Sequence, residues 1–135
     1  MSRDEDIRWK QKFSNFEKSF RRLEKSLCIE NPSETEKAGV IQFFEIAFEL
    51  SCKLMKDYLE TLGFNLNSPR ASIKQAFQSD IISDGHIWLE ALKHRNQTTH
   101  IYDEKTANKI LKSVKNKYFP AIKEFYEFMK LKSEK

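Results

Sequence analysis

Apolar residues along the chain recur at alternating intervals of four and three, the spacing that places them on one face of an α-helix. Between Ile7 and about Ile29 this pattern is unbroken, and polar or charged residues fill the other positions. The apolar members of this face are Trp9, Phe13, Phe16, Phe20, Leu23 and Leu27. Such a row predicts one helix that packs along another.

A second, wider apolar stripe predicts a central helix that touches two neighbours or a second subunit. Its start has two candidate caps: Asn31, followed by a proline, or Ser33 in a capping box with Glu36. Gly63 predicts a left-handed cap at its end. The stripe consists of Val40, Ile41, Phe44, Ala47, Phe48, Leu50, Leu54, Met55, Tyr58, Leu59 and Leu62.

Two shorter helices are expected after this central one. Ser68 precedes a proline and predicts the start of a short helix that ends near Ser79. A further helix begins near Asp84. The residues expected to face inward are Ile73, Ala76 and Phe77 in the short helix, and Ile87, Trp88, Leu89, Ala91 and Leu92 in the next.

The last helix is expected from about Glu104 towards Lys130, with Asp103 as its cap. Pro120 lacks a backbone donor and clashes with the preceding turn, which predicts a kink or break near Phe119. The expected inward residues are Ala107, Ile110, Leu111, Val114, Tyr118, Ile122, Phe125 and Met129.

Together these elements predict an all-α fold: a four-helix up-and-down bundle with one additional short helix. The 135 residues suit one domain over residues 1–135, without room for a second core. Only 3 glycines and 3 prolines are present, fewer than a sheet with tight turns usually needs.

Composition also predicts the setting of the protein. Cys28 and Cys52 both fall within apolar helical patterns, so we expect buried free thiols in a reducing compartment, with a disulfide between packed helices as the alternative. The charged N-terminus does not resemble a secretory signal, and no run of about 18 apolar residues exists to span a membrane. By elimination we expect a cytoplasmic protein.

The inward face of the fourth helix changes character near its end. After Leu92 the next positions on that face are Arg95 and Asn96. An inward arginine is costly unless it meets a counter-charge or a water-filled cleft. One interpretation is therefore a buried salt bridge, whose candidate partners are Glu45, Glu49 and Asp57. The other is that Arg95 faces a cleft and binds a phosphate, for which its planar fork is suited.

The residues after Arg95 add groups that suit phosphodiester chemistry without a metal. His100 can titrate near neutral pH, as imidazoles do, and could serve as acid or base. Asn96 lies four residues before it, so on a continuous helix their side chains would adjoin. His86 and His94 have no partners at metal-ligand spacing, and we expect neither a metal nor a cofactor.

A basic stretch follows this segment. Residues 105–117 contain five lysines and no acid, although the net charge of the whole chain is only +4. Lys105, Lys109 and Lys112 form one stripe on the expected last helix. The stripe is either a phosphate track that leads RNA to the cleft or simply the solvated face of an amphipathic helix.

The order Arg95, Asn96, three residues, His100, one residue, Tyr102 resembles the motif of the HEPN superfamily (higher eukaryotes and prokaryotes nucleotide-binding). The match is closer to its bacterial branch of nucleotidyltransferase substrate-binding proteins. The resemblance also covers residues 58–63, 68–70 and 81–88, whereas residues 1–30 match only in helical character.

This resemblance implies a helical bundle that forms a homodimer and is paired with a separately encoded minimal nucleotidyltransferase, as in toxin–antitoxin systems. It implies metal-independent RNA cleavage in which Arg95 stabilises the phosphorane, His100 acts as acid or base and Asn96 orients it. It further implies that the partner attaches AMP to Tyr102 and silences the nuclease. Without such a modification, Tyr102 would simply pack at the helix junction.

Two alternatives to the ribonuclease remain. The first is a non-catalytic subunit that binds a nucleotide or another substrate for the partner nucleotidyltransferase, using Arg95 and the lysines. The second is a helical scaffold in which Arg95 forms only a structural salt bridge.

Overall fold

The computed structural model describes residues 3–97 and 103–135, and within these ranges the chain is helical without a strand. The elements are α1 (Arg3–Ser26), α2 (Glu34–Thr61), α3 (Pro69–Gln78), α4 (Gly85–Gln97), α5 (Glu104–Ser113), the π-helical turn η2 (Val114–Tyr118) and α6 (Phe119–Ser133). The predicted all-α fold is confirmed. No helix in the described ranges combines the length and apolar character needed to cross a membrane.

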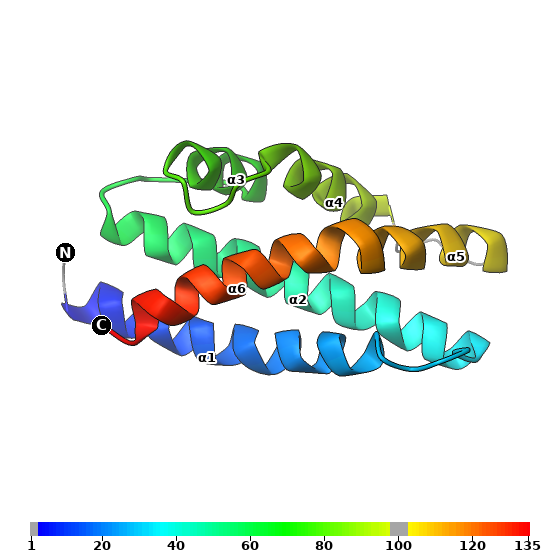
Figure 1. Ribbon diagram of the computed structural model, residues 1–135. Coiled ribbons are helices and arrows are strands. Elements are labelled where there is room, and N and C mark those ends of the chain that lie inside the picture. Colours follow the sequence, from blue (N-terminus) through cyan, green and yellow to red (C-terminus); the bar gives the residue numbers. More distant parts are fainter. Residues whose placement is uncertain (1–2, 98–102) are drawn as a thin grey trace.

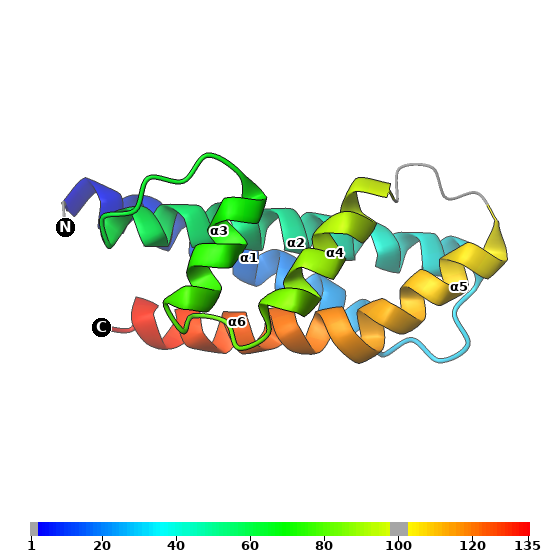
Figure 2. The same ribbon diagram turned by 90° about the horizontal axis from the view of Figure 1, so that it is seen from above.

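Three long rods form the body of the bundle, and the two shorter helices lie across one face of it (Figure 1). α1 and α2 run antiparallel, and α5, η2 and α6 form a third rod that runs in the same sense as α2. Figure 2 shows α4 slanting back in the opposite sense, with α3 beside it. α1, α2, α4 and the last rod therefore give the up-and-down order, and α3 is the additional short helix.

The ends of α2 follow the sequence signals. Ser33 forms the capping box: its Oγ accepts from the Glu36 N–H at 3.1 Å, and Glu36 Oε1 accepts from the Ser33 N–H at 2.9 Å. Of the two candidate caps, Ser33 is therefore the one used. Gly63 has φ 97°, and its N–H donates to the Glu60 carbonyl at 3.1 Å, the left-handed cap that was predicted.

The core is rich in aromatic residues, and most of the predicted inward positions are buried. Its largest fully buried side chains are Trp88, Tyr118, Phe16, Phe20, Phe44, Phe48 and Phe125. These residues come from α1, α2, α4, η2 and α6, so one core joins all the long elements. Burial of these positions is what the helix periodicity predicted.

Three predicted inward positions are wrong. Phe77 is 49% exposed, because Ile73 and Ala76 occupy the inward face of α3 and Phe77 instead lies beside Gly85. Leu62 is exposed because it lies past the last turn of α2. Cys28 is exposed for the same reason beyond the end of α1, whereas Cys52 is buried, and both thiols are free.

Pro120 leaves the last rod continuous. The clash from which a kink was predicted is relieved by the π-helical turn η2 directly before Pro120. In this turn the Phe119 N–H donates to the Val114 carbonyl. A wider turn moves the carbonyl that the proline ring would otherwise meet. The helix therefore continues to Ser133.

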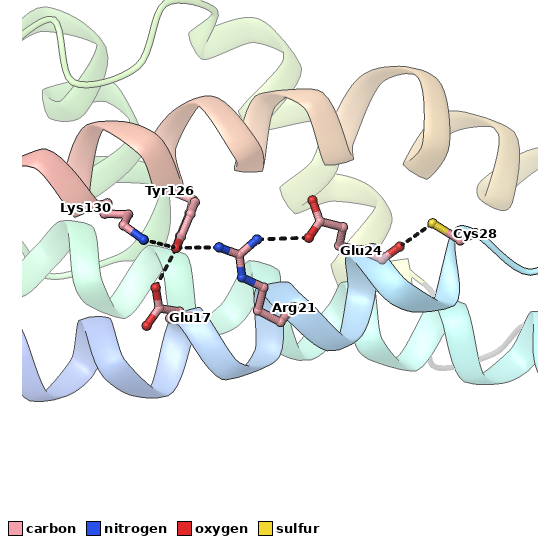
Figure 3. A network of polar contacts seen from close by, with 6 residues as sticks. All are labelled: Glu17, Arg21, Glu24, Cys28, Tyr126 and Lys130. Atoms are coloured by element: carbon pink, nitrogen blue, oxygen red, sulfur yellow. Dashed lines mark hydrogen bonds and ion pairs between the residues drawn. The ribbon is translucent and has the colours of Figure 1, made fainter.

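A polar network fastens α6 to α1 (Figure 3). The Tyr126 hydroxyl donates to Glu17 Oε2 at 2.5 Å and accepts from Arg21 Nη2 at 3.0 Å and from Lys130 Nζ at 3.4 Å. The Arg21 guanidinium also binds Glu24 at 3.0 Å and lies over the Tyr126 ring. Burial raises the pKa of Tyr126 above its ordinary value, so its hydroxyl remains a donor.

Candidate functional site

Arg95 lies near the end of α4, and its guanidinium contacts two carboxylates of α2. Nη2 lies 3.3 Å from Glu49 Oε2, and Nη1 lies 3.9 Å from Glu45 Oε2. These are two of the three partners that the salt-bridge interpretation named. The third, Asp57, pairs instead with Lys12 of α1 at 2.7 Å. The predicted ion pair therefore exists, although it is not buried as predicted, and α2 positions the arginine.

The ion pair is partly open to solvent. The side chain of Arg95 is 30% exposed and that of Glu49 is 48% exposed. Lys53 also contacts Glu49 at 3.3 Å, and hydrogen bonds from Lys53 and then Arg95 lower the pKa of that carboxyl. Solvent-exposed pairs of this kind contribute only about 0–1 kcal/mol. The pair therefore orients Arg95, and replacing the carboxylate of Glu49 by another anion costs little free energy.

Arg95 also lines a groove of about 450 Å³ between α2, the start of α3 and the end of α4. This volume lies within the range of about 300–1,000 Å³ that is typical of ligand sites. The lining residues are Phe48, Glu49, Cys52, Lys53, Lys56, Asn67, Ser68, Pro69, Ser72, Leu92, Arg95 and Asn96. Arg95 is thus both ion-paired and part of the groove lining, and its binding of a phosphate stays a prediction.

Asn96, also predicted as a site residue, is exposed and lines the same groove. The contribution of α3 was not predicted, although Ser68 and Pro69 mark the start of that helix in the sequence. No periodicity shows that this helix start will meet the end of α4, because the two lie far apart in the chain. The groove is therefore a finding of the structure.

A second cavity, of about 500 Å³, lies between the end of α4 and α5. Its lining residues are His94, Gln97, Thr106, Lys109, Ile110, Lys112 and Ser113. Two of the three predicted lysines thus border a hollow beside the α4 terminus. Lys105 is exposed and is not among the lining residues. Whether this stripe binds RNA stays a prediction.

His94, at the border of this second cavity, is engaged in a structural contact. Its Nδ1 lies 2.5 Å from the hydroxyl of Tyr118, which is buried. Burial, together with the nearby Glu90, raises the pKa of Tyr118. The described part of the chain holds no group of three side chains that could bind a metal ion.

His100 and Tyr102 lie outside the described residues, so their roles stay predictions, as does a contact between Asn96 and His100. The described chain resumes at Asp103, which caps α5 as predicted: its Oδ1 accepts from the Thr106 N–H at 2.7 Å. Hydrogen bonds from Thr106 lower the pKa of Asp103. In the sequence, residues 98–102 thus follow the helix that carries Arg95 and precede the basic helix α5.

Comparisons with known proteins agree with this fold. The chain is 34% identical over 79 residues to a Haemophilus influenzae protein named "Probable ribonuclease HepT", covering 55% of this chain and 54% of that protein. The chain thus spans about half the length of this curated relative. A crystal structure of a Thermus thermophilus protein superposes with a TM-score of 0.75 at 26% identity, over 89% of this chain and 99% of that one.

A family model described as "Nucleotidyltransferase substrate binding protein like" matches residues 11–131. This match begins within α1 and ends within α6, so it covers most of these two helices and all the elements between them. It confirms the resemblance drawn from residues 95–102. The chain belongs to the nucleotidyltransferase substrate binding protein-like family.

Proposed function

We propose that the chain is the HEPN-type partner of a separately encoded minimal nucleotidyltransferase, and that Arg95 and His100 form a metal-independent ribonuclease site. The observation that supports the proposal is the position of Arg95, the first residue of the motif. Its guanidinium is oriented by carboxylates of α2, and it lines a groove. The family match and the name of the Haemophilus influenzae relative support it.

Each residue has a chemical role in this proposal. The guanidinium of Arg95 leaves Glu49 and binds the phosphate, where its fork stabilises the negative charge that builds up on phosphorus. His100 transfers the protons that the attacking and leaving oxygens release and take up. Asn96 orients His100. No step needs a metal ion, because the arginine supplies the positive charge.

The site acts as a homodimer in this proposal. One arginine and one histidine per chain make a small site, and the resemblance implies two copies that face each other across one cleft. The lysines at positions 105, 109 and 112 guide the RNA backbone towards it. Mixing Arg95→Ala and His100→Ala subunits tests this arrangement, because activity of the mixture above either variant alone would require a shared site.

The direct test is RNA cleavage by the purified protein in EDTA, beside Arg95→Ala and His100→Ala. Arg22, exposed on α1, offers a matched control in Arg22→Ala. We expect cleavage by the parent and by this control, and none by the two site variants. Equal cleavage by all four proteins, or none by the parent, would rule the site out.

Control by the partner is the second part of the proposal. The nucleotidyltransferase attaches AMP to Tyr102 and silences the nuclease. Mass spectrometry after co-expression should then find one added adenylyl group on Tyr102 and none in Tyr102→Phe. A modified protein that still cleaves RNA would contradict this mechanism of control.

A non-catalytic binding subunit is the second candidate, favoured by the two carboxylates that engage Arg95 and by the family description. Here the groove presents a nucleotide or another substrate to the partner. This candidate predicts a stable complex with the nucleotidyltransferase and a higher rate of that enzyme in the complex. A partner equally active alone would exclude it.

A further inference from the structure

The last turn of α4, which contains Arg95, is joined to the bundle by polar contacts. The last buried residue of α4 is Ala91, which precedes this turn. Arg95 reaches α2, where it pairs with Glu49 at 3.3 Å. Its neighbour His94 reaches the last rod, where its Nδ1 lies 2.5 Å from the Tyr118 hydroxyl of η2. Two adjacent side chains thus join one helical turn to two different rods.

Tyr118 provides a well-packed partner for this contact. Its side chain is fully buried, and its ring stacks on Phe44 of α2 at 5.4 Å between centroids. It ends the π-helical turn η2, and such turns occur frequently at functional sites. Burial raises the pKa of Tyr118, so the hydroxyl keeps its proton and can donate to Nδ1 of a neutral His94. The contact therefore ties His94 to the packed core.

The two contacts respond differently when an anion binds. In the proposed function Arg95 leaves the carboxylates of α2 for a phosphate, which removes its contact with that helix. The His94–Tyr118 pair takes no part in this exchange and stays formed. Because neighbouring Cα atoms are only about 3.8 Å apart, a fixed His94 also restrains the backbone of Arg95. Restraint matters here, since a catalytic group displaced by about 1 Å can lose about 100-fold in rate.

We propose that His94 and Tyr118 are positioning residues, which hold the last turn of α4 while Arg95 exchanges the carboxylates of α2 for a phosphate. This role rests on the proposed function, because the phosphate is the one that Arg95 binds there. Neither side chain contacts the reacting atoms in this arrangement, and both act through Arg95.

The first measurement follows hydrogen exchange of the backbone amides of residues 94–97 by NMR, which reports how often this turn opens. Tyr118→Phe is made in the parent chain and in Arg95→Ala, which imitates the loss of contact with α2. Exchange should quicken about 3- to 10-fold in both backgrounds, as for one lost hydrogen bond. Unchanged exchange in the Arg95→Ala background would overturn the proposal. Tyr126→Phe, which removes a hydroxyl from the joint between α1 and α6, is the matched control and should leave these amides unchanged.

The second measurement is the rate of RNA cleavage in EDTA. Tyr118→Phe should lower kcat on the order of 10-fold and leave KM unchanged, because a displaced guanidinium loses more in the transition state than in the bound ground state. The same change in Arg95→Ala should cause no further loss. An equal loss in both backgrounds would leave the pair a merely structural role and overturn the proposal.

Variants of His94 separate the hydrogen bond from the ring. His94→Asn keeps an acceptor near the position of Nδ1 and should retain parental amide exchange and kcat. His94→Ala removes the acceptor and should behave as Tyr118→Phe does. It also carries both measurements if Tyr118→Phe does not fold, since His94 is only half-buried. Parental exchange and kcat in His94→Ala would contradict the positioning role.

Failure of this role and failure of the nuclease are distinguishable. If the parent cleaves no RNA, the nuclease proposal fails, and amide exchange in the Arg95→Ala background alone decides whether the pair holds the turn. If Arg95→Ala loses cleavage while Tyr118→Phe keeps parental exchange and kcat, the nuclease stands and the positioning role is overturned.

Discussion

Two regions of this bundle each place an arginine beside carboxylates, and they differ in what else surrounds the guanidinium. Arg21 of α1 binds Glu24 and the Tyr126 hydroxyl (Figure 3). Its guanidinium also lies over two aromatic rings, those of Phe20 and Tyr126. Arg95 of α4 pairs with two carboxylates of α2 and lines a groove.

The comparison shows that an ion pair does not by itself define the role of an arginine. Every contact of Arg21 described above belongs to the joint between α1 and α6, so its replacement should affect stability. Arg95 lines a groove and forms only a weak, partly exposed ion pair, so its guanidinium can exchange the carboxylate for a ligand. The following predictions test this contrast, from the largest expected effect to the smallest.

Each region contains one cysteine, and the reactivity of these two thiols should show the largest difference between the regions. Cys28 is exposed, next to the Arg21 network, whereas Cys52 lines the groove and burial raises its pKa to about 12. At pH 8 such a thiol is about 0.01% thiolate, the only form that reacts readily. A thiol reagent at this pH should therefore modify Cys28 and leave Cys52 intact until guanidinium unfolds the protein. Rapid modification of two thiols in the native protein would contradict the buried position of Cys52.

Loss of the aromatic joint should be the most destabilising of these changes. Phe20 is fully buried and stacks on Tyr126 and Phe119 at 4.4 and 5.4 Å between ring centroids. Phe20→Ala should cost about 3–5 kcal/mol in the free energy of unfolding, measured by urea denaturation. RNA affinity of the folded fraction should be unchanged. A loss below about 1 kcal/mol would show that this joint is not packed as described.

Removing one hydroxyl from the network tests its polar part. Tyr126→Phe keeps the ring but leaves Glu17 and Arg21 without their shared partner. We expect a loss of about 1–2 kcal/mol in the free energy of unfolding, since one buried hydroxyl and its bonds disappear. Glu24→Gln, whose side chain contacts Arg21 at the more exposed edge, is the milder control. An equal loss of unfolding free energy in both variants would show that the Tyr126 hydroxyl is not the centre of this network.

Glu49→Gln should have the smallest effect on stability of these changes, and it should strengthen RNA binding. It should change the free energy of unfolding by less than about 1 kcal/mol at neutral pH. RNA affinity should rise, because Arg95 exchanges partners more easily. The folded-state pKa of Glu49 is lowered below its ordinary value of 4.5, so its stabilising contribution is complete above pH 4.5 and disappears as the pH falls through the lower value.

A pH series of melting temperatures measures this contribution. The difference between parent and Glu49→Gln should be constant from pH 7 to about pH 5 and should shrink towards pH 3. A difference that grows on acidification would mean that Glu49 is not stabilised as a carboxylate by Lys53 and Arg95.

The sequence predicted the helices because their signals are local. The capping box of Ser33 and the cap at Gly63 each lie within one helical turn, and the core spacing repeats within each helix. Phe77 was misplaced because its position on a short helix depends on what packs over it. The same holds for Cys28, since a residue just past a helix end leaves the helical face.

The site was predicted only in part, for the same reason. An inward arginine was visible in the sequence, and so were three acids that could meet it. Which of them does so depends on how α4 crosses α2, and Asp57 is held by Lys12 instead. The groove itself depends on the start of α3 meeting the end of α4, and no spacing within either helix encodes that meeting. The contact between His94 and Tyr118 likewise depends on how α4 lies against η2.

The most direct measurement is the initial rate of RNA cleavage in EDTA by the parent, Arg95→Ala and Arg21→Ala, each shown to be folded at the assay temperature. We expect Arg95→Ala to lose about 100- to 1,000-fold in rate, the usual cost of removing one group that stabilises transition-state charge, with little change in melting temperature. Arg21→Ala should melt at a lower temperature and cleave at the parental rate. Parental cleavage by Arg95→Ala would contradict the assignment of the groove arginine to the chemistry.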